Sequence, residues 1–245
     1  GVIDPWLAKS WEHNDDCTEW TFNLRDDAYF TDGVQFDADV CLKNIERWGH
    51  GITSTYTTLS IEKSLPNLDK MEKVDDFTVK FTFTQPITTL EYVLSDYGSP
   101  MYSPNCFDEE TGVISDYAIG TGPYKITDHV ESEYVTLERN DNYYGEKGKV
   151  KTFKIRCIPD AETRVSALKS GEVLGLADNG AITMDAAKNL CDTDSNFEMD
   201  STPSHMTEYI MFNDKNEYLA DKRMREAFNL ATDRDSICSV IYGGL

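Results

Sequence analysis

Alternation of apolar and polar residues marks strands in the first half of the chain. Residues 19–24 (EWTFNL) and 77–83 (FTVKFTF) each place apolar side chains at every second position. This period of two is typical of a strand with one buried face. The acidic pair at 75–76 precedes the second strand and predicts a hairpin with residues 71–74. The pattern therefore predicts an antiparallel sheet in this part of the chain.

A helical period follows the first strand. Cys41, Ile45 and Trp48 recur three or four residues apart, and Asp37 stands where an N-cap belongs. This spacing puts the three apolar side chains on one face of a helix. We expect a helix over 38–48 that packs on the core.

The middle of the chain carries more turns. A proline-bearing loop is expected at 96–107, followed by strands at 124–127 and 134–139. The stretch 140–148 is polar and glycine-bearing, which favours a domain boundary there.

Beyond this stretch strands and helices alternate, as in an α/β lobe. The expected elements are a strand at 153–157, a helix that Gly171 closes, a strand at 207–213, and helices at 222–232 and 234–242. The sequence predicts two parts, a strand-rich subdomain at 1–147 and part of a larger α/β sheet subdomain at 148–245.

Charge narrows the function classes. The chain has 245 residues, with 23 Lys and Arg against 44 Asp and Glu, so the formal net charge is −21. A surface this acidic repels nucleic-acid phosphates and anionic lipid headgroups, so nucleic acid is excluded as a partner. No apolar run approaches the roughly 18 residues of a membrane span.

The cysteines form no metal or redox motif. Six cysteines lie far apart and no C-x-x-C pair occurs, which excludes a zinc ribbon and a thioredoxin-type site. Free buried thiols are one interpretation, and one or two disulfides are the other. The six are Cys17, Cys41, Cys106, Cys157, Cys191 and Cys238.

The chain also lacks catalytic and phosphate-binding motifs. No G-x-S-x-G, H-E-x-x-H or G-x-x-x-x-G-K-[ST] occurs, and no two of the four histidines lie three or four residues apart. The sequence predicts no catalytic residue, no resident metal and no cofactor. An extracellular hydrolase, the alternative from another class, needs a nucleophile–base pair that these motifs do not supply.

Four sequence blocks give a family resemblance when taken in order. They comprise 5–12 (PWLAKSWE) with 20–27 (WTFNLRDD), 30–33 (FTDG) and 36–38 (FDA); 120–124 (GTGPY) with 137–145 (LERNDNYYG); 158–164 (IPDAETR) with 167–172 (ALKSGE); and 221–227 (DKRMREA) with 233–235 (DRD). This order resembles the family 5 solute-binding proteins of ABC importers, which capture peptides, dipeptides and nickel complexes.

The resemblance implies a fold and a length. The expected fold is α/β, with lobe I of a periplasmic-binding-protein type (class II, family 5) that includes a strand-rich small subdomain. Members of the family run to about twice this length, in two lobes that close on the ligand. We therefore expect this chain to be an N-terminal lobe fragment of a longer protein, with the second lobe missing.

The resemblance also implies a function outside the cytoplasm. It indicates a monomer that captures a small peptide or peptide-like solute and delivers it to the permease subunits in the membrane, without catalysis. It places the protein in the periplasm or on the outer face of the membrane, tethered as a lipoprotein. A receptor for a nickel chelate is the alternative within the family.

The resemblance implies one ligand contact, Arg139, and the chemistry of the segment 98–104 adds Met101 and Tyr102 as candidates. Arg139 occupies the place of an arginine that pairs with a carboxylate of the bound chelate in nickel-type members; it could instead anchor the strand end to a nearby acid. Met101 and Tyr102 either line the cleft or pack in the core. The nickel type has a second arginine before a proline turn, and residues 98–104 (GSPMYSP) contain none.

Overall fold

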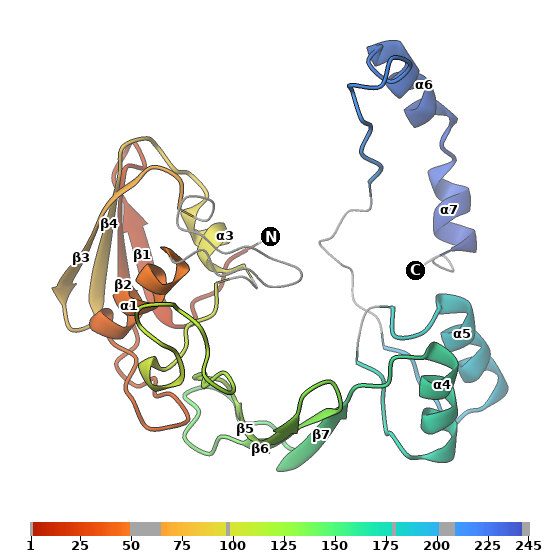
Figure 1. Cartoon of the computed structure of the whole chain (residues 1–245), viewed down its shortest axis with the longest axis horizontal. Helices are drawn as coiled ribbons and strands as arrows, with labels where there is room; N and C mark the ends of the chain where they lie inside the picture. The colour runs from red at the N-terminus through yellow and green to blue at the C-terminus, as the bar shows by residue number, and fades with distance from the viewer. Residues whose placement is uncertain (1, 50–64, 97–98, 178–179, 201–208, 242–245) are drawn as a thin grey trace. The chain divides into compact units, whose positions relative to one another are not determined.

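The computed structural model describes residues 2–49, 65–96, 99–177, 180–200 and 209–241. The chain divides into two compact units, Gly1–Cys157 and Ile158–Leu245. Figure 1 shows the elements of both units, and each unit is described by itself.

The first unit is built on a four-stranded antiparallel sheet of order β1-β2-β4-β3. Its strands are β1 (Ala8–His13), β2 (Glu19–Leu24), β3 (Leu68–Asp75) and β4 (Thr78–Phe83). Phe22 of β2 lies opposite Val79 of β4 and Trp11 of β1. The expected hairpin is present as β3 and β4. The register places the apolar face of each central strand on the same side.

Helix α1 (Ala38–Gly49) covers the apolar face of this sheet. Cys41, Ile45 and Trp48 are all buried, and the carboxylate of Asp37 accepts the Val40 N–H at 2.9 Å. The N-cap and the core-facing stripe expected from the sequence are thus confirmed. Two short helices follow, α3 (Leu90–Leu94) and the 3₁₀ turn η1 (Pro104–Cys106).

A three-stranded antiparallel sheet completes the first unit. It contains β5 (Tyr124–Val130), β6 (Tyr134–Arg139) and β7 (Thr152–Arg156) in that order. Because β6 pairs with β7, the stretch 140–148 joins two strands of one sheet, and the compact units divide later, at Cys157. The assignment of 1–147 and 148–245 to separate subdomains stays a prediction.

Described by itself, the second unit contains helices. They are α4 (Ala161–Ser170), α5 (Met184–Thr193), α6 (Lys222–Ala231) and α7 (Arg234–Val240). Asp160 caps α4 through the Thr163 N–H, and Gly171 ends it at φ 75°, as its sequence position predicts. Residues 209–213 form no strand, so that prediction is wrong there; 207–208 lie outside the described residues. Alternation fits a strand, but a strand forms only beside a partner that takes its hydrogen bonds.

The cysteines are free, and two of them are buried. All six are unpaired thiols, yet only Cys41 and Cys106 are buried, while Cys157 and Cys238 are exposed. The expectation of free thiols holds, and that of general burial does not. Among the described helices, none is long and apolar enough to cross a bilayer.

Candidate functional site

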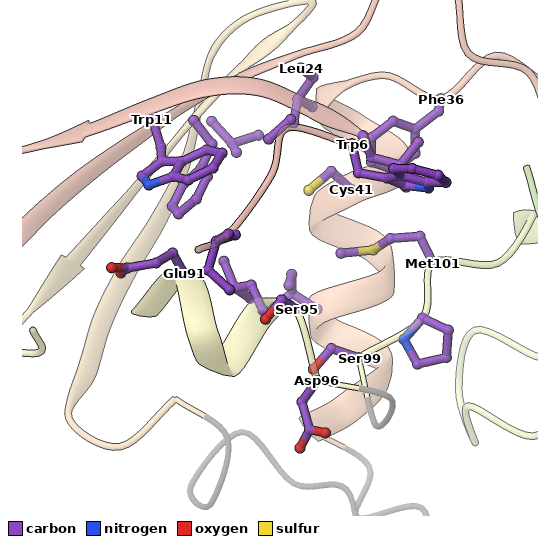
Figure 2. A pocket seen from close by; sticks show the side chains of 18 of the residues that line it. Trp6, Trp11, Leu24, Phe36, Cys41, Glu91, Ser95, Asp96, Ser99 and Met101 are labelled. Atoms are coloured by element: carbon purple, nitrogen blue, oxygen red, sulfur yellow. The ribbon is translucent and has the colours of Figure 1, made fainter. Parts of the chain in front are cut away.

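A pocket of about 510 Å³ opens in the first unit, between the four-stranded sheet, α1 and α3. Figure 2 shows that labelled side chains from these elements surround one space, with Trp11 and Leu24 from the sheet, Cys41 from α1 and Glu91 from α3. Its lining residues are Ile3, Asp4, Trp6, Leu7, Ala8, Trp11, Phe22, Leu24, Phe36, Cys41, Ile45, Val79, Phe81, Glu91, Leu94, Ser95, Asp96, Ser99, Pro100, Met101 and Thr121. Pockets of this size commonly hold small molecules.

The walls of the pocket are mostly apolar, and five of the lining residues are aromatic: Trp6, Trp11, Phe22, Phe36 and Phe81. Phe22 and Phe36 are buried in the core, and Trp11 stacks on Phe22 with ring centroids 6.4 Å apart. Trp6 lies at the mouth, where 60% of its surface remains exposed. Aromatic faces offer a large apolar contact area and attract cations. The walls therefore suit an apolar group, including one that carries a positive charge.

The charged residues of the pocket are all acidic. Asp4, Glu91 and Asp96 line it, and the described lining residues include no Lys, Arg or His. The Oε2 atom of Glu91 is buried and has no hydrogen-bond partner within the described part of the chain. A buried carboxylate oxygen without a donor is costly, and three acids without a base make the pocket electronegative. The pocket therefore favours a cationic or donor group over an anion.

The structure separates the two adjacent ligand candidates. Met101 lines the pocket, and Figure 2 shows its side chain near Cys41 of α1. Tyr102 is outside the lining set; its ring centroid lies 4.8 Å from the Arg47 guanidinium. Burial raises the pKa of the Tyr102 hydroxyl, so it stays protonated at neutral pH. Ligand contact by either residue stays a prediction.

Arg139 lies at the end of β6 and apart from the pocket lining. Its Nε donates to the Asp141 carboxylate at 2.8 Å, and its Nη1 donates to the Gly148 carbonyl at 3.2 Å. This hydrogen bond lowers the pKa of the Asp141 carboxyl. These contacts fasten the stretch between β6 and β7, and a ligand role for Arg139 stays a prediction.

Sequence reasoning missed most of the pocket. Trp6 and Trp11 belong to the first family block, but the sequence does not show that these two tryptophans line a pocket. Glu91 is the single acid in the short apolar helix LEYVL, a signal that could have been singled out. Within the described residues, no group of three or more His, Cys, Asp or Glu side chains is placed to hold a metal ion.

A family match covers nearly the whole sequence. Residues 2–245 match the family described as "Bacterial extracellular solute-binding proteins, family 5 Middle". The chain belongs to this family. The resemblance inferred from the four sequence blocks is therefore confirmed.

Two curated relatives that are similar to this chain differ in the ligands given in their names. The nickel-binding periplasmic protein of Escherichia coli (strain K12) is 28% identical over 247 residues, covering 99% of this chain and 46% of the relative. The probable D,D-dipeptide-binding periplasmic protein DdpA of the same strain is 27% identical over 246 residues, covering 97% and 45%. The chain spans about half the length of these relatives.

A solved structure supports the fold of this family 5 chain. NikA from Brucella suis, in complex with Fe(III)-EDTA, is similar with a TM-score of 0.75 and 26% identity, over 100% of this chain and 49% of that one. This similarity covers about half of the NikA chain and confirms the expected α/β fold of one lobe.

Proposed function

We propose that this chain is part of the substrate-binding component of an ABC importer, which captures a peptide or peptide-like solute outside the cytoplasm. Family membership over residues 2–245 supports solute binding. The aromatic pocket with acidic residues and no base among its described lining supports a solute with an apolar side chain and an ammonium group. The solute is bound and released to the permease without any bond being made or broken.

The pocket chemistry favours a peptide over an anionic metal chelate. The two relatives, one nickel-binding and one probable dipeptide-binding by name, are almost equally similar, so identity does not separate the ligands. An anion placed near Asp4, Glu91 and Asp96 would be repelled, whereas an ammonium would be attracted. A nickel-chelate receptor remains the second candidate, favoured by the nickel-binding relative and by the similarity to the NikA structure.

A hydrolase is disfavoured by the geometry of a thiol–imidazole pair, Cys17 and His13, in the described part of the chain. The Cys17 Sγ lies 3.6 Å from the His13 Nδ1, and the same nitrogen lies 2.8 Å from the Asn14 carbonyl. A nitrogen facing a carbonyl carries the proton, so it is a poor base toward the thiol. We therefore expect no enzymatic turnover of bound peptide.

The partners and location follow from the family. We propose a monomer in the periplasm or on the outer face of the membrane, held there as a lipoprotein and docking on ABC permease subunits. A formal charge of −21 supports the absence of nucleic-acid partners. A second lobe, in a protein about twice this length, would close the solute site.

Calorimetric titration tests the choice of solute. The dipeptide Phe-Ala carries an ammonium next to an aromatic side chain, and its N-acetylated form removes only that charge. We expect the full-length protein to bind Phe-Ala at least tenfold more tightly than acetyl-Phe-Ala, and the 245-residue chain to bind it far more weakly. Tight binding of Ni²⁺ with excess L-histidine and none of Phe-Ala would replace the peptide proposal with the nickel alternative.

A further inference from the structure

Asn44 of α1 holds the backbone of the loop that carries Met101. The side chain is fully buried, at 0% exposure. Its Nδ2 donates to the Tyr102 carbonyl at 2.8 Å, and its Oδ1 accepts the Tyr102 N–H at 2.8 Å. Nδ2 also donates to the Val40 carbonyl at 3.0 Å. The amide thus pairs with Tyr102 as a neighbouring strand would, and joins the loop to the helix.

Arg47 contacts two aromatic rings of the same loop, those of Tyr102 and Phe107. The residue is 3% exposed, and its guanidinium lies 4.8 Å from the Tyr102 ring and 5.6 Å from the Phe107 ring. Its Nε and Nη2 have no hydrogen-bond partner within the described part of the chain. Burial lowers the pKa of Arg47, whereas its neighbour Tyr102 acts in the opposite direction. The two aromatic rings are therefore contacts of this cation within the described residues.

Ser103, the next residue of the loop, makes two further hydrogen bonds that hold it. The buried Ser103 hydroxyl donates to the Asp32 carboxylate at 2.6 Å, and the Ser103 N–H donates to the Ile119 carbonyl at 2.8 Å. The backbone on the far side of Tyr102 is thus also held. Met101 is the next residue on the pocket side, so its place in the wall depends on these contacts.

We propose that Asn44 and Arg47 are positioning residues of the solute site, an inference that rests on the proposed function. Neither lines the pocket, and both bind the residue next to one that does. No carboxylate of the described residues pairs with Arg47, and a buried arginine of this kind adds little stability, because an apolar residue of similar length could fill its place. Its contribution is to fix the Tyr102 ring and backbone in one arrangement, so that Met101 presents a constant surface to the solute.

Amide hydrogen exchange on the 245-residue chain tests the hydrogen bond between the Tyr102 N–H and Asn44 without any ligand. We expect the Tyr102 amide to exchange slowly in the unmodified chain. In Asn44→Ala the exchange should be at least a hundredfold faster, while the Phe81 amide in the sheet keeps its protection. An unchanged Tyr102 exchange rate in Asn44→Ala would overturn the inference.

The affinity for Phe-Ala tests whether Arg47 positions the solute site. Arg47→Met keeps the length and packing of the side chain, so the melting temperature should hold or rise while Phe-Ala binding falls at least tenfold. Lys43→Met on the same helix is the matched control, because the ion pair that Lys43 makes in the described part of the chain is with exposed Glu109 at 2.6 Å; it should leave affinity unchanged. Equal losses in the two variants would overturn the inference. Failure of the unmodified protein to bind Phe-Ala would count against the proposed function, and the exchange rates alone would then decide the role of Asn44.

Discussion

Two buried cysteines give a matched test of the pocket. Cys41 and Cys106 are each 4% exposed, but only Cys41 is a lining residue. Burial raises the pKa of Cys41 to about 12, so the thiol is neutral and acts as a small apolar group. The change to leucine enlarges both side chains by the same amount, with open space beside one and packed atoms beside the other.

The expected stabilities have opposite signs. In Cys41→Leu the two additional heavy atoms enter the pocket, which contributes up to about 1.6 kcal/mol at about 0.8 kcal/mol per buried carbon group. Leucine also has the higher helix propensity. In Cys106→Leu the added atoms meet packed surroundings, and the change removes contacts of Sγ with the Ser103 carbonyl at 3.2 Å and the Ile119 N–H at 3.4 Å. Overpacking of this kind costs about 1–3 kcal/mol.

Thermal unfolding and titration together read the result. A domain of this size moves by about 2–4 °C per kcal/mol, so Cys41→Leu should melt about 3–6 °C higher and Cys106→Leu lower. Cys41→Leu should also weaken Phe-Ala binding at least tenfold, because it fills the space the solute needs. A loss of stability in Cys41→Leu as large as that in Cys106→Leu would refute the open pocket.

Further changes test the second unit and the candidate ligand residue. Gly171→Ala should cost about 1–2 kcal/mol by denaturant unfolding because φ is +75°, whereas Gly175→Ala, with open space and no positive φ, should cost little. The hydroxyl and N–H of Thr163 lower the pKa of the Asp160 carboxyl, so its contribution is complete above the unfolded pKa of about 3.9 and is lost as the pH falls through the lower folded value. Far-UV circular dichroism should show this helix loss at acid pH, and less of it in Asp160→Ser, which caps without titrating. Arg139→Gln should reduce Phe-Ala affinity at least tenfold with a melting temperature within a few degrees, if the guanidinium serves the ligand; a large stability loss with unchanged affinity would assign Arg139 to its strand. Free Ni²⁺ should give no saturable one-to-one rise in melting temperature, and such a rise would revive the nickel alternative.

The elements were largely predictable because their signals are local. The strand at 19–24, the helix after Asp37 and the stop at Gly171 each depend on residues within one turn or one strand of each other. The strand expected at 207–213 failed over 209–213, since pairing depends on a distant partner that alternation does not specify. Cys41 is buried and Cys157 is exposed, a difference that also depends on distant packing partners rather than on the local sequence.

The pocket was not predictable from the sequence. It forms where Trp6, Phe36, Glu91 and Met101 converge from segments that are far apart in the chain. Of the three ligand candidates, only Met101 lines it; the adjacent Tyr102 lies outside the lining, and Arg139 lies at the end of β6. A family block locates residues along the sequence and leaves their side-chain directions to the fold.

Native mass spectrometry of the full-length protein, purified without removal of bound solute, tests solute capture most directly. We expect mass adducts that match intact short peptides, with the same masses after prolonged incubation because no bond is cleaved. Adducts with the isotope pattern of nickel would contradict the peptide assignment. Peptide adducts that shorten with time would contradict the claim that the protein binds its solute without hydrolysing it.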